Sequence, residues 1–546
     1  MQMRYLSENK REDMRMKKRT AARSMAALMG AAMVLTACGG GNTTTPTTGA
    51  SSGGETQTAS ESAESGKITK TDIVVGMGAD VVTLDPAGQQ DTTSGVLMKH
   101  AYSTLLDVDN EGKVVPDLAE SYEMKSDTEY VFKLREDACF WDGTPVTAQD
   151  VKFSLDRAKG MPKTKSNTSK IEEVIANGDH EVTIKLTEPY AAFKTIVTQH
   201  NLSILSEKAV TEAGDSYGDV DNLLGSGPFK VAEWVPNDHY TLVRNDNYWG
   251  EMPIATSITC RVIPEGSART IALEAGEIDI VWNVDPTDCA NVDSNPDVKL
   301  LSQPSTGIDY VGMNTQKEKF SDKRVRQAIN YALDKQAFVD TIIEGRGLVA
   351  NSYINAAIPG WTDEVEAYPY DPEKAKELLA EAGYPDGFEC SIYVNGDVRT
   401  RSAQILQAQL ADVGIKVDIS TYEWGALLDT LNAGEHEMFL LGWSNTSFDP
   451  DGSTYQLFYS GNHGATGNRA FFSNDKVDEL ILSAQRESEE SKRMELYKEL
   501  QFVLHEESPW CPLYYKENNV GVRADLKGFT LHAGAQHYLG NCHYEE

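Results

Sequence analysis

Basic residues are scarce in this sequence. Its 546 residues include 50 Lys and Arg against 83 Asp and Glu, which gives a formal net charge of −33 at pH 7. A surface of this sign repels nucleic acid and anionic lipid head groups, and it favours solubility. The composition therefore argues against nucleic acid as a partner.

Long apolar runs are also missing. The run from Met25 to Leu35 contains about a dozen residues, whereas a membrane-spanning helix needs about 20. It follows a basic segment, as in an export signal. No later segment predicts a transmembrane helix.

Leu35-Thr36-Ala37-Cys38 lies where a signal peptide would end. These residues resemble the lipobox of bacterial lipoproteins, in which the cysteine is diacylated and becomes the mature N-terminus, and two acyl chains give a stable anchor. Residues 39–66 are mostly Gly, Ser, Thr, Ala, Glu and Gln, a composition typical of a flexible tether. We expect a signal peptide over 1–37, then lipidated Cys38 and a linker over 38–66, on the outer face of a bacterial cell membrane.

The remaining six cysteines, at positions 139, 260, 289, 390, 511 and 542, are widely scattered. None forms a Cys-x-x-Cys pair or a metal-finger spacing. An even number in an exported protein permits disulfides, and the scatter is equally natural for buried thiols. Of these alternatives we favour the thiols.

From about Lys67 the pattern is mixed α/β. Short apolar or alternating runs predict strands at 73–75, 130–134, 182–186 and 415–419. Thr147 with Asp150 predicts a capping box, and Asp371 before Pro372 predicts a helix start, with Gly383 at its end. Alternating helices and strands indicate an α/β lobe from about 310 to 510. About 480 ordered residues exceed one core, so two or three lobes are expected.

Several separated motifs occur in a fixed order along this folded part. They are Pro116 to Ser121, Phe132 to Arg135, Phe140 to Pro145, Thr147 to Val151, Gly225 to Phe229, Tyr248 to Gly250, Asn314-Thr315, Phe320 to Ile329, Ala375 to Leu379, Ala382 to Pro385, Tyr422 to Trp424 and Gly442-Trp443. Together they resemble the extracellular solute-binding proteins of family 5, which include the dipeptide- and oligopeptide-binding components of ABC importers.

The resemblance implies a two-lobed, periplasmic-binding-protein-like α/β fold with an additional inserted subdomain and a hinged ligand cleft. Lobe I would comprise 67–104, 223–308 and 515–546, the subdomain 105–222, and lobe II 309–514. The hinge would lie near Ser305 to Met313 and Pro509 to Tyr515. Closure would exclude water and strengthen polar contacts with the ligand.

Two charged anchors of peptide-binding relatives are altered in this sequence. Their aspartate for the ligand ammonium corresponds to Thr446 here, and an ungapped count places Tyr393 where dipeptide binders carry an arginine for the ligand carboxylate. Arg399 or Arg401 would take that position if a small gap intervened. These departures weaken the case for free dipeptides and leave longer peptides or a neutral ligand such as an oligosaccharide.

Aromatic and polar residues complete the candidate site. Trp and Tyr stack on sugar rings as readily as they line side-chain pockets. We predict ligand contacts from Trp443, Asn445, Thr446, Trp424, Tyr422, Tyr310, Trp282, Tyr393 and Arg401.

Other functions have weaker support. Gly214-Asp215-Ser216-Tyr217-Gly218 matches the Gly-x-Ser-x-Gly pattern of hydrolases, but residues 207–213 before it predict a helix instead of the required strand. Asp107 to Gly112 imitates a calcium loop whose twelfth position is Leu118, so a hairpin turn explains it better. We predict no enzyme activity, no cofactor and a monomer.

The predicted function is a lipid-anchored receptor that captures a peptide and delivers it to ABC permease and ATPase subunits. A non-peptide ligand such as an oligosaccharide or a metal complex, and a surface sensor or adhesin with the same fold, are the alternatives.

Overall fold

A computed structural model describes residues 67–546, and these residues form one compact unit. Cys38 and the predicted linker lie outside the described residues. No helix of the described part combines the length and apolar character needed to cross a bilayer. The mixed α/β class predicted from the sequence is confirmed.

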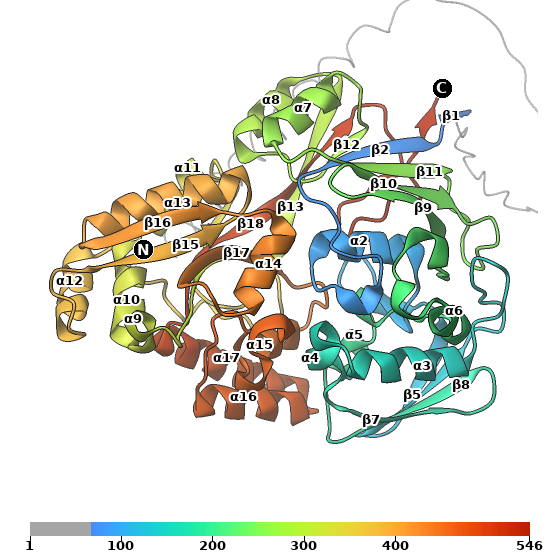
Figure 1. Cartoon of the computed structure of the whole chain (residues 1–546), viewed down its shortest axis with the longest axis horizontal. Coiled ribbons are helices and arrows are strands. Elements are labelled where there is room, and N and C mark those ends of the chain that lie inside the picture. Colours follow the sequence, from blue (N-terminus) through green and yellow to red (C-terminus); the bar gives the residue numbers. More distant parts are fainter. Residues whose placement is uncertain (1–66) are drawn as a thin grey trace, which may run out of the picture. The chain divides into compact units, whose positions relative to one another are not determined.

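The fold is organised by an eleven-stranded sheet that runs through both halves of the described unit (Figure 1). Ten strands follow one another across the sheet, and an eleventh, β14 (Gly347–Val349), pairs with β18. The order is β16 (Ile415–Thr421), β15 (Phe388–Val394), β17 (Met438–Ser444), β13 (Val298–Met313), β18 (Trp510–Arg523), β12 (Ile280–Val281), β2 (Asp72–Met77), β11 (Ser257–Val262), β10 (His239–Arg244) and β9 (Phe229–Val235).

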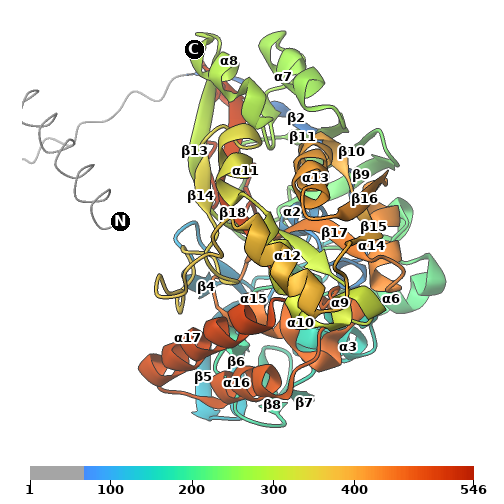
Figure 2. The ribbon, with the colours of Figure 1, turned by 90° about the vertical axis from the view of Figure 1, so that its left-hand side faces the viewer.

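The centre of this sheet is an antiparallel pair of long strands, β13 and β18, which lie side by side in Figures 1 and 2. One end of β13 pairs Val298 with Arg523, near β12, and its other end pairs Gly312 with Trp510, next to β17. The register shifts between Pro304 and Ile308. The predicted hinge segments therefore lie within or beside paired strands instead of in loops.

A second, four-stranded antiparallel sheet lies within residues 105–222. Its order is β5 (Ala119–Ser126), β6 (Glu129–Leu134), β8 (Glu181–Leu186) and β7 (Ile171–Ala176). Two smaller pairs join β3 (Leu106–Val108) to β4 (Val114–Pro116) and β1 (Ile68–Lys70) to β19 (Tyr544–Glu545). The turn between β3 and β4 contains Gly112 at φ +82°, so the hairpin predicted for this segment is confirmed.

Helices cover these sheets. Those of the first half and residues 105–222 are α2 (Thr92–Ala101), α3 (Ala148–Lys159), α4 (Lys165–Thr168), α5 (Phe193–Ile196), α6 (Glu207–Ala213), α7 (Gly266–Glu274) and α8 (Cys289–Ser294). The others are α9 (Glu318–Ser321), α10 (Lys323–Ala332), α11 (Lys335–Thr341), α12 (Pro372–Glu381), α13 (Gly396–Ala411), α14 (Trp424–Asn432), α15 (Asp451–Phe458), α16 (Asp475–Arg486) and α17 (Glu490–Glu507).

Local sequence signals account for several helix starts. The Thr147 and Asp150 capping box opens α3, and Asp371 Oδ1 accepts a hydrogen bond of 2.9 Å from the backbone N–H of Lys374 at the start of α12. Both predictions are confirmed. The segment Gly214 to Gly218 follows helix α6, as predicted, so it lacks the strand that a nucleophile elbow requires.

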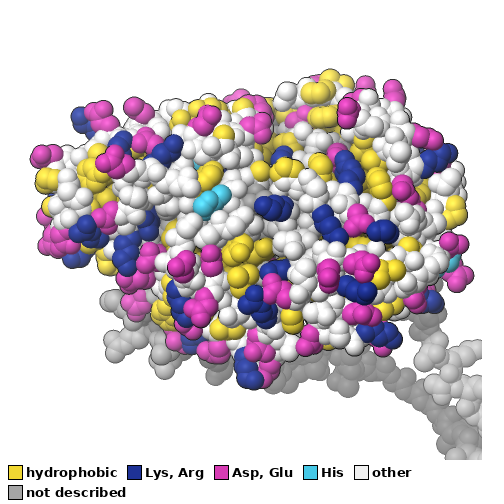
Figure 3. All heavy atoms as spheres, turned by 60° about the horizontal axis from the view of Figure 1, so that its bottom comes forward, with side chains coloured by type: hydrophobic (Ala, Val, Ile, Leu, Met, Phe, Trp, Pro, Cys, Tyr) yellow, Lys and Arg dark blue, Asp and Glu magenta, His cyan; other side chains and the backbone are white. Residues whose placement is uncertain are grey.

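Buried apolar side chains form separate clusters. One joins residues 73–102, 205–282 and 520–542, a second lies within residues 105–204, and two more join residues 308–514 with Tyr515. The six described cysteines are free thiols, five of them buried. Acidic and basic side chains are interspersed over the face in Figure 3, and exposed pairs such as Lys185 with Glu173 contribute little, so the clusters hold the fold together.

We expect this fold to lose stability in mild acid. Burial lowers the pKa of six histidines, in each case below the unfolded value: His100, His436, His505 and His532 to about 4, and His200 and His537 to about 3. Between about pH 6.5 and 4 the unfolded chain therefore binds more protons than the folded protein, and the free energy of unfolding falls as the pH falls.

Three buried carboxyls oppose this trend, because burial raises the pKa of Asp117 to about 7, that of Asp451 to about 6 and that of Asp91 above its usual value. Six histidines outweigh three aspartates. Urea unfolding at pH 7.5, 6.0 and 4.5 measures the balance, and the His537→Gln variant should show a shallower pH dependence. A free energy of unfolding that rises steadily on acidification would contradict this expectation.

Candidate functional site

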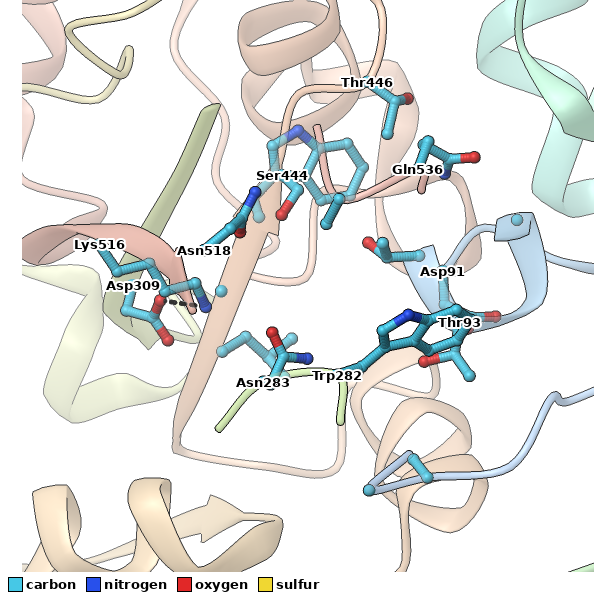
Figure 4. A pocket seen from close by; sticks show the side chains of 18 of the residues that line it. Asp91, Thr93, Trp282, Asn283, Asp309, Ser444, Thr446, Lys516, Asn518 and Gln536 are labelled. Atoms are coloured by element: carbon cyan, nitrogen blue, oxygen red, sulfur yellow. Dashed lines mark ion pairs between the residues drawn. The ribbon is translucent and has the colours of Figure 1, made fainter. Parts of the chain in front are cut away.

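A cavity of about 420 Å³ lies between the two halves of the described unit. Its walls come from the start of α2, the 3₁₀ helix His200–Leu202, β13, β17, α14, β18 and the segment around Gln536. Asp309 and Lys516 lie on one side and Asp91, Thr93 and Trp282 on the opposite side (Figure 4). The volume falls within the range of small-molecule sites, about 300–1,000 Å³.

The lining is rich in charge but balanced, in contrast to the chain as a whole. It contains six basic and six acidic side chains: Lys99, Arg269, Arg346, Arg399, Arg469 and Lys516, with Asp91, Asp107, Asp285, Asp309, Asp397 and Glu517. Some are matched within the protein, since Lys99 Nζ lies 2.8 Å from Asp107 Oδ2 and Lys516 Nζ lies 2.7 Å from Asp309 Oδ2.

One carboxylate oxygen of Asp91 has no hydrogen-bond partner within the protein. Asp91 is the N-cap of α2, where Oδ1 accepts a hydrogen bond of 2.9 Å from the backbone N–H of Ser94. Oδ2 is buried without a hydrogen-bond partner, although the Trp424 indole is near enough to favour the charged carboxylate. Burial is the larger influence and raises the pKa of Asp91. A cation in the cavity would stabilise the charged form of this carboxylate, which burial has separated from water.

Arg469 is a buried cation in the lining of the same cavity. It is 6% exposed, and its Nε donates a hydrogen bond of 3.0 Å to Asn432 Oδ1. Among the described residues no carboxylate lies within ion-pair distance of Arg469. Desolvation lowers the pKa of its guanidinium, and the nearby charge of Asp91 partly offsets this effect. A guanidinium so placed offers a ready site for a carboxylate.

Sequence reasoning missed both residues. Asp91 before Thr92 carries only the signal of a helix cap, and Arg469 stands in Gly467-Asn468-Arg469-Ala470, which matches no motif. Their role depends on which charges the fold leaves without partners, and spacing along the chain does not contain that information.

Four of the predicted aromatic residues line the cavity: Trp282, Tyr310, Trp424 and Trp443. Trp443 Nε1 donates a hydrogen bond of 3.0 Å to the carbonyl of Gly452, which fixes the indole. Tyr310 is 1% exposed and stacks on Trp510 with ring centroids 3.5 Å apart, so it supports the wall more than it faces the cavity. Tyr393 and Tyr422 pack against each other, 4.9 Å between centroids, outside the lining.

Of the predicted polar residues, one lines the cavity and another lies outside it. Thr446 lines the cavity, but its Oγ1 donates a hydrogen bond of 2.8 Å to Gln199 Oε1. Asn445 is buried outside the lining, where its Nδ2 donates bonds of 2.7 Å to the Asp449 carbonyl and to Ser453 Oγ. The structure thus gives Asn445 a role in shaping the loop.

Arg401, predicted as a ligand contact, is instead paired within the protein. Its Nη2 lies 2.8 Å from Asp285 Oδ1 and 2.9 Å from Oδ2. Burial of Asp285 works against its charge, yet hydrogen bonds from Arg401 and Thr287 hold its pKa below the usual value. Arg399, two residues earlier on α13, lines the cavity.

Comparisons with known proteins agree with this geometry. The family described as "Bacterial extracellular solute-binding proteins, family 5 Middle" matches residues 113–465. The glutathione-binding protein GsiB of Escherichia coli strain K12 is 32% identical over 473 residues, 84% of this chain and 92% of its own.

Solved structures are similar over most of both chains. The periplasmic binding protein DppA of Helicobacter pylori, in complex with the peptide STSA, superposes with a TM-score of 0.83 at 28% identity, covering 88% of this chain and 99% of its own. The oligopeptide-binding protein AppA of Bacillus subtilis, in complex with a nonapeptide, gives 0.82 at 26% identity, covering 88% and 100%.

These matches confirm the predicted periplasmic-binding-protein fold and the absence of a catalytic role, because the family consists of non-catalytic solute receptors. The chain belongs to family 5 of the bacterial extracellular solute-binding proteins, and it is an extracytoplasmic solute-binding protein of an ABC importer.

Proposed function

We propose that this protein captures a short peptide with a free ammonium group and a free carboxylate and delivers it to an ABC permease. The observation that carries the proposal is the presence, in one cavity, of Asp91 with a buried oxygen that lacks a partner and of Arg469 without a carboxylate. A zwitterionic ligand satisfies both groups at once.

The cost of leaving these charges unmatched supports a charged ligand over a neutral one. A buried charge without a partner costs several kcal/mol. A neutral oligosaccharide would exclude water from Asp91 and Arg469 and leave only their attraction for each other to offset that loss. The names of relatives point the same way, since GsiB is called a glutathione-binding protein and DppA was solved with a tetrapeptide.

Cavity size supports a short ligand. About 420 Å³ lies in the lower part of the range for small-molecule sites. Trp282, Trp424 and Trp443 supply apolar walls for peptide side chains.

Closure is the proposed delivery step. Arg401 with Asp285 and Thr446 with Gln199 join the proposed lobe II to lobe I and to the inserted subdomain across the cavity. We propose that these contacts form when the lobes close and that bending of β13 and β18 near the register shift after Pro304 opens them.

Ligand binding tests the peptide assignment directly. A thermal-shift screen of glutathione, peptides of two to eight residues, oligosaccharides and nickel–histidine complexes should give the largest shift with a short peptide. Stabilisation is about 2.7 kcal/mol at a ligand concentration of one hundred times Kd. If an oligosaccharide or a nickel complex shifts the melting temperature and no peptide does, the assignment is wrong.

Calorimetry with variants tests the two anchors. Asp91→Asn and Arg469→Met should each lower the affinity for the bound peptide at least tenfold, because each leaves one ligand charge without its partner. Asn is as good an N-cap as Asp, so α2 should persist. Arg244→Gln, on β10 outside the cavity, is the matched control. Equal affinity for N-acetylated or C-amidated forms of the peptide would contradict these roles.

Stability measurements distinguish a ligand-binding arginine from a structural one. Without ligand, Arg469→Met should raise the free energy of unfolding by about 0.5–2 kcal/mol, because a buried charge without a partner is removed. Arg493→Met should lower it by about 3–5 kcal/mol, since Arg493 pairs with buried Asp449. Urea denaturation measures both, and a large loss for Arg469→Met would argue for a structural role.

We also propose that Cys38 carries the lipid anchor, a prediction that rests on the sequence. Cys38→Ala should move the protein from the membrane fraction to the soluble fraction of the producing bacterium. Ligand affinity of the purified variant should be unchanged. Retention of the variant in washed membranes would contradict the anchor.

A further inference from the structure

A second charged group in the cavity lies around Asp309. Asp309 is on β13 and is 4% exposed. Two cations share its single carboxylate: Lys516 Nζ lies 2.7 Å from Oδ2, whereas Arg399 Nε lies 4.0 Å from Oδ1. Lys516 therefore takes the close position, and the cluster has an excess of one positive charge.

The guanidinium of Arg399 is held in position by contacts within the protein, and part of its hydrogen-bonding capacity is unused. Its Nη1 donates a hydrogen bond of 2.7 Å to Asn395 Oδ1, and the guanidinium lies 5.9 Å from the centre of the Trp424 ring. The Nε is buried without a hydrogen-bond partner. A rigid guanidinium with unused donors is well suited to a planar carboxylate.

Three neighbouring acids do not supply that carboxylate. Asp285 is held by Arg401, and Asp107 by Lys99. Asp397, at the start of α13, is exposed to solvent, so water screens its charge.

Another arginine of the lining, Arg269, is held mainly by backbone carbonyls. It is 7% exposed and donates hydrogen bonds of 2.7, 2.9 and 3.3 Å to the carbonyls of Ile263, Pro264 and Asn283. These carbonyls occupy both terminal nitrogens of Arg269, although its Nε, like that of Arg399, is buried without a hydrogen-bond partner.

We propose that Arg399, with Lys516 and Asp309 beside it, is a second carboxylate subsite, and that the preferred ligand carries two carboxylates and one ammonium group. This inference rests on the proposed capture of a short peptide and narrows it to acidic peptides of net charge −1. Asp91 takes the ammonium, Arg469 one carboxylate and Arg399 the other.

The positions of the charged groups in Figure 4 indicate how the ligand would be oriented in the cavity. Asp309 and Lys516 lie across the cavity from Asp91. The second carboxylate therefore binds on the side of the cavity where Asp309 and Lys516 lie. Because closure removes water from both ends, a ligand with an amide in place of this carboxylate leaves Arg399 without an anion.

Two pairs of matched peptides test the inference on the unaltered protein. Glutathione is compared with its glycine amide, and Glu-Ala-Gly with Gln-Ala-Gly, so that each pair differs by one carboxylate. In the series that binds more tightly, calorimetry should give at least tenfold higher affinity for the dicarboxylate. The Arg399→Gln variant should reduce this ratio to less than threefold, with Arg244→Gln as the control that keeps it.

The outcomes separate this inference from the proposed function. If members of each pair bind equally, or if the preference survives in Arg399→Gln, the second subsite is wrong while peptide capture stands. If no peptide binds, both fail. Since the comparison of peptides uses the unaltered protein, it decides the question even if Arg399→Gln does not fold.

Discussion

The pairing of β13 with β18 is the constraint on which the rest of the structure depends. Each strand has residues in both halves of the large sheet, so a single ladder positions β12 and β2 on one side and β17 and β15 on the other. Asp309 and Lys516, which approach the cavity from this pair, are anchored to the most continuous element of the fold. The register shift after Pro304 is a local departure from regular pairing beside them.

The charged side chains of the cavity differ from those of the surface in burial and in pairing. Surface pairs are exposed and numerous, whereas several of the cavity charges are buried and only partly matched within the protein. A receptor that satisfied every buried charge internally would be more stable but would have less to offer a ligand. In the proposed binding mode Asp91, Arg399 and Arg469 lower the stability of the ligand-free protein because they lack close partners of opposite charge. Arg493 and Asp449, by contrast, form a buried ion pair within the protein.

Sequence patterns predicted the parts of the fold that depend on neighbours along the chain. The caps at Thr147 and Asp371 and the alternation in β6 and β8 involve residues within a few positions of one another, so they could be recognised directly. The continuous central sheet could not, because β13 and β18 are separated by about two hundred residues and their pairing is a property of the folded chain.

The site was predictable only in part, for the same reason. Trp443 and Thr446 were found through a motif, and both line the cavity. Asn445 was chosen beside the same motif, and Arg401 through a family position that requires a small gap. The fold uses both for internal contacts. Asp91 and Arg469 went unnoticed because what distinguishes them is a missing partner, which becomes visible only when burial and every neighbour are known.

The position of β18 late in the chain has a consequence for biogenesis. This strand fills the middle of the sheet between β13 and β12, and Gln536, near the C-terminus, lines the cavity. A chain that crosses a membrane N-terminus first cannot complete its central ladder until β18 has emerged, about two hundred residues after β13. The four-stranded sheet, whose strands all lie within residues 119–186, can form much earlier. The contacts between the two halves, and with them the walls of the binding cavity, can therefore be completed only after β18 has emerged.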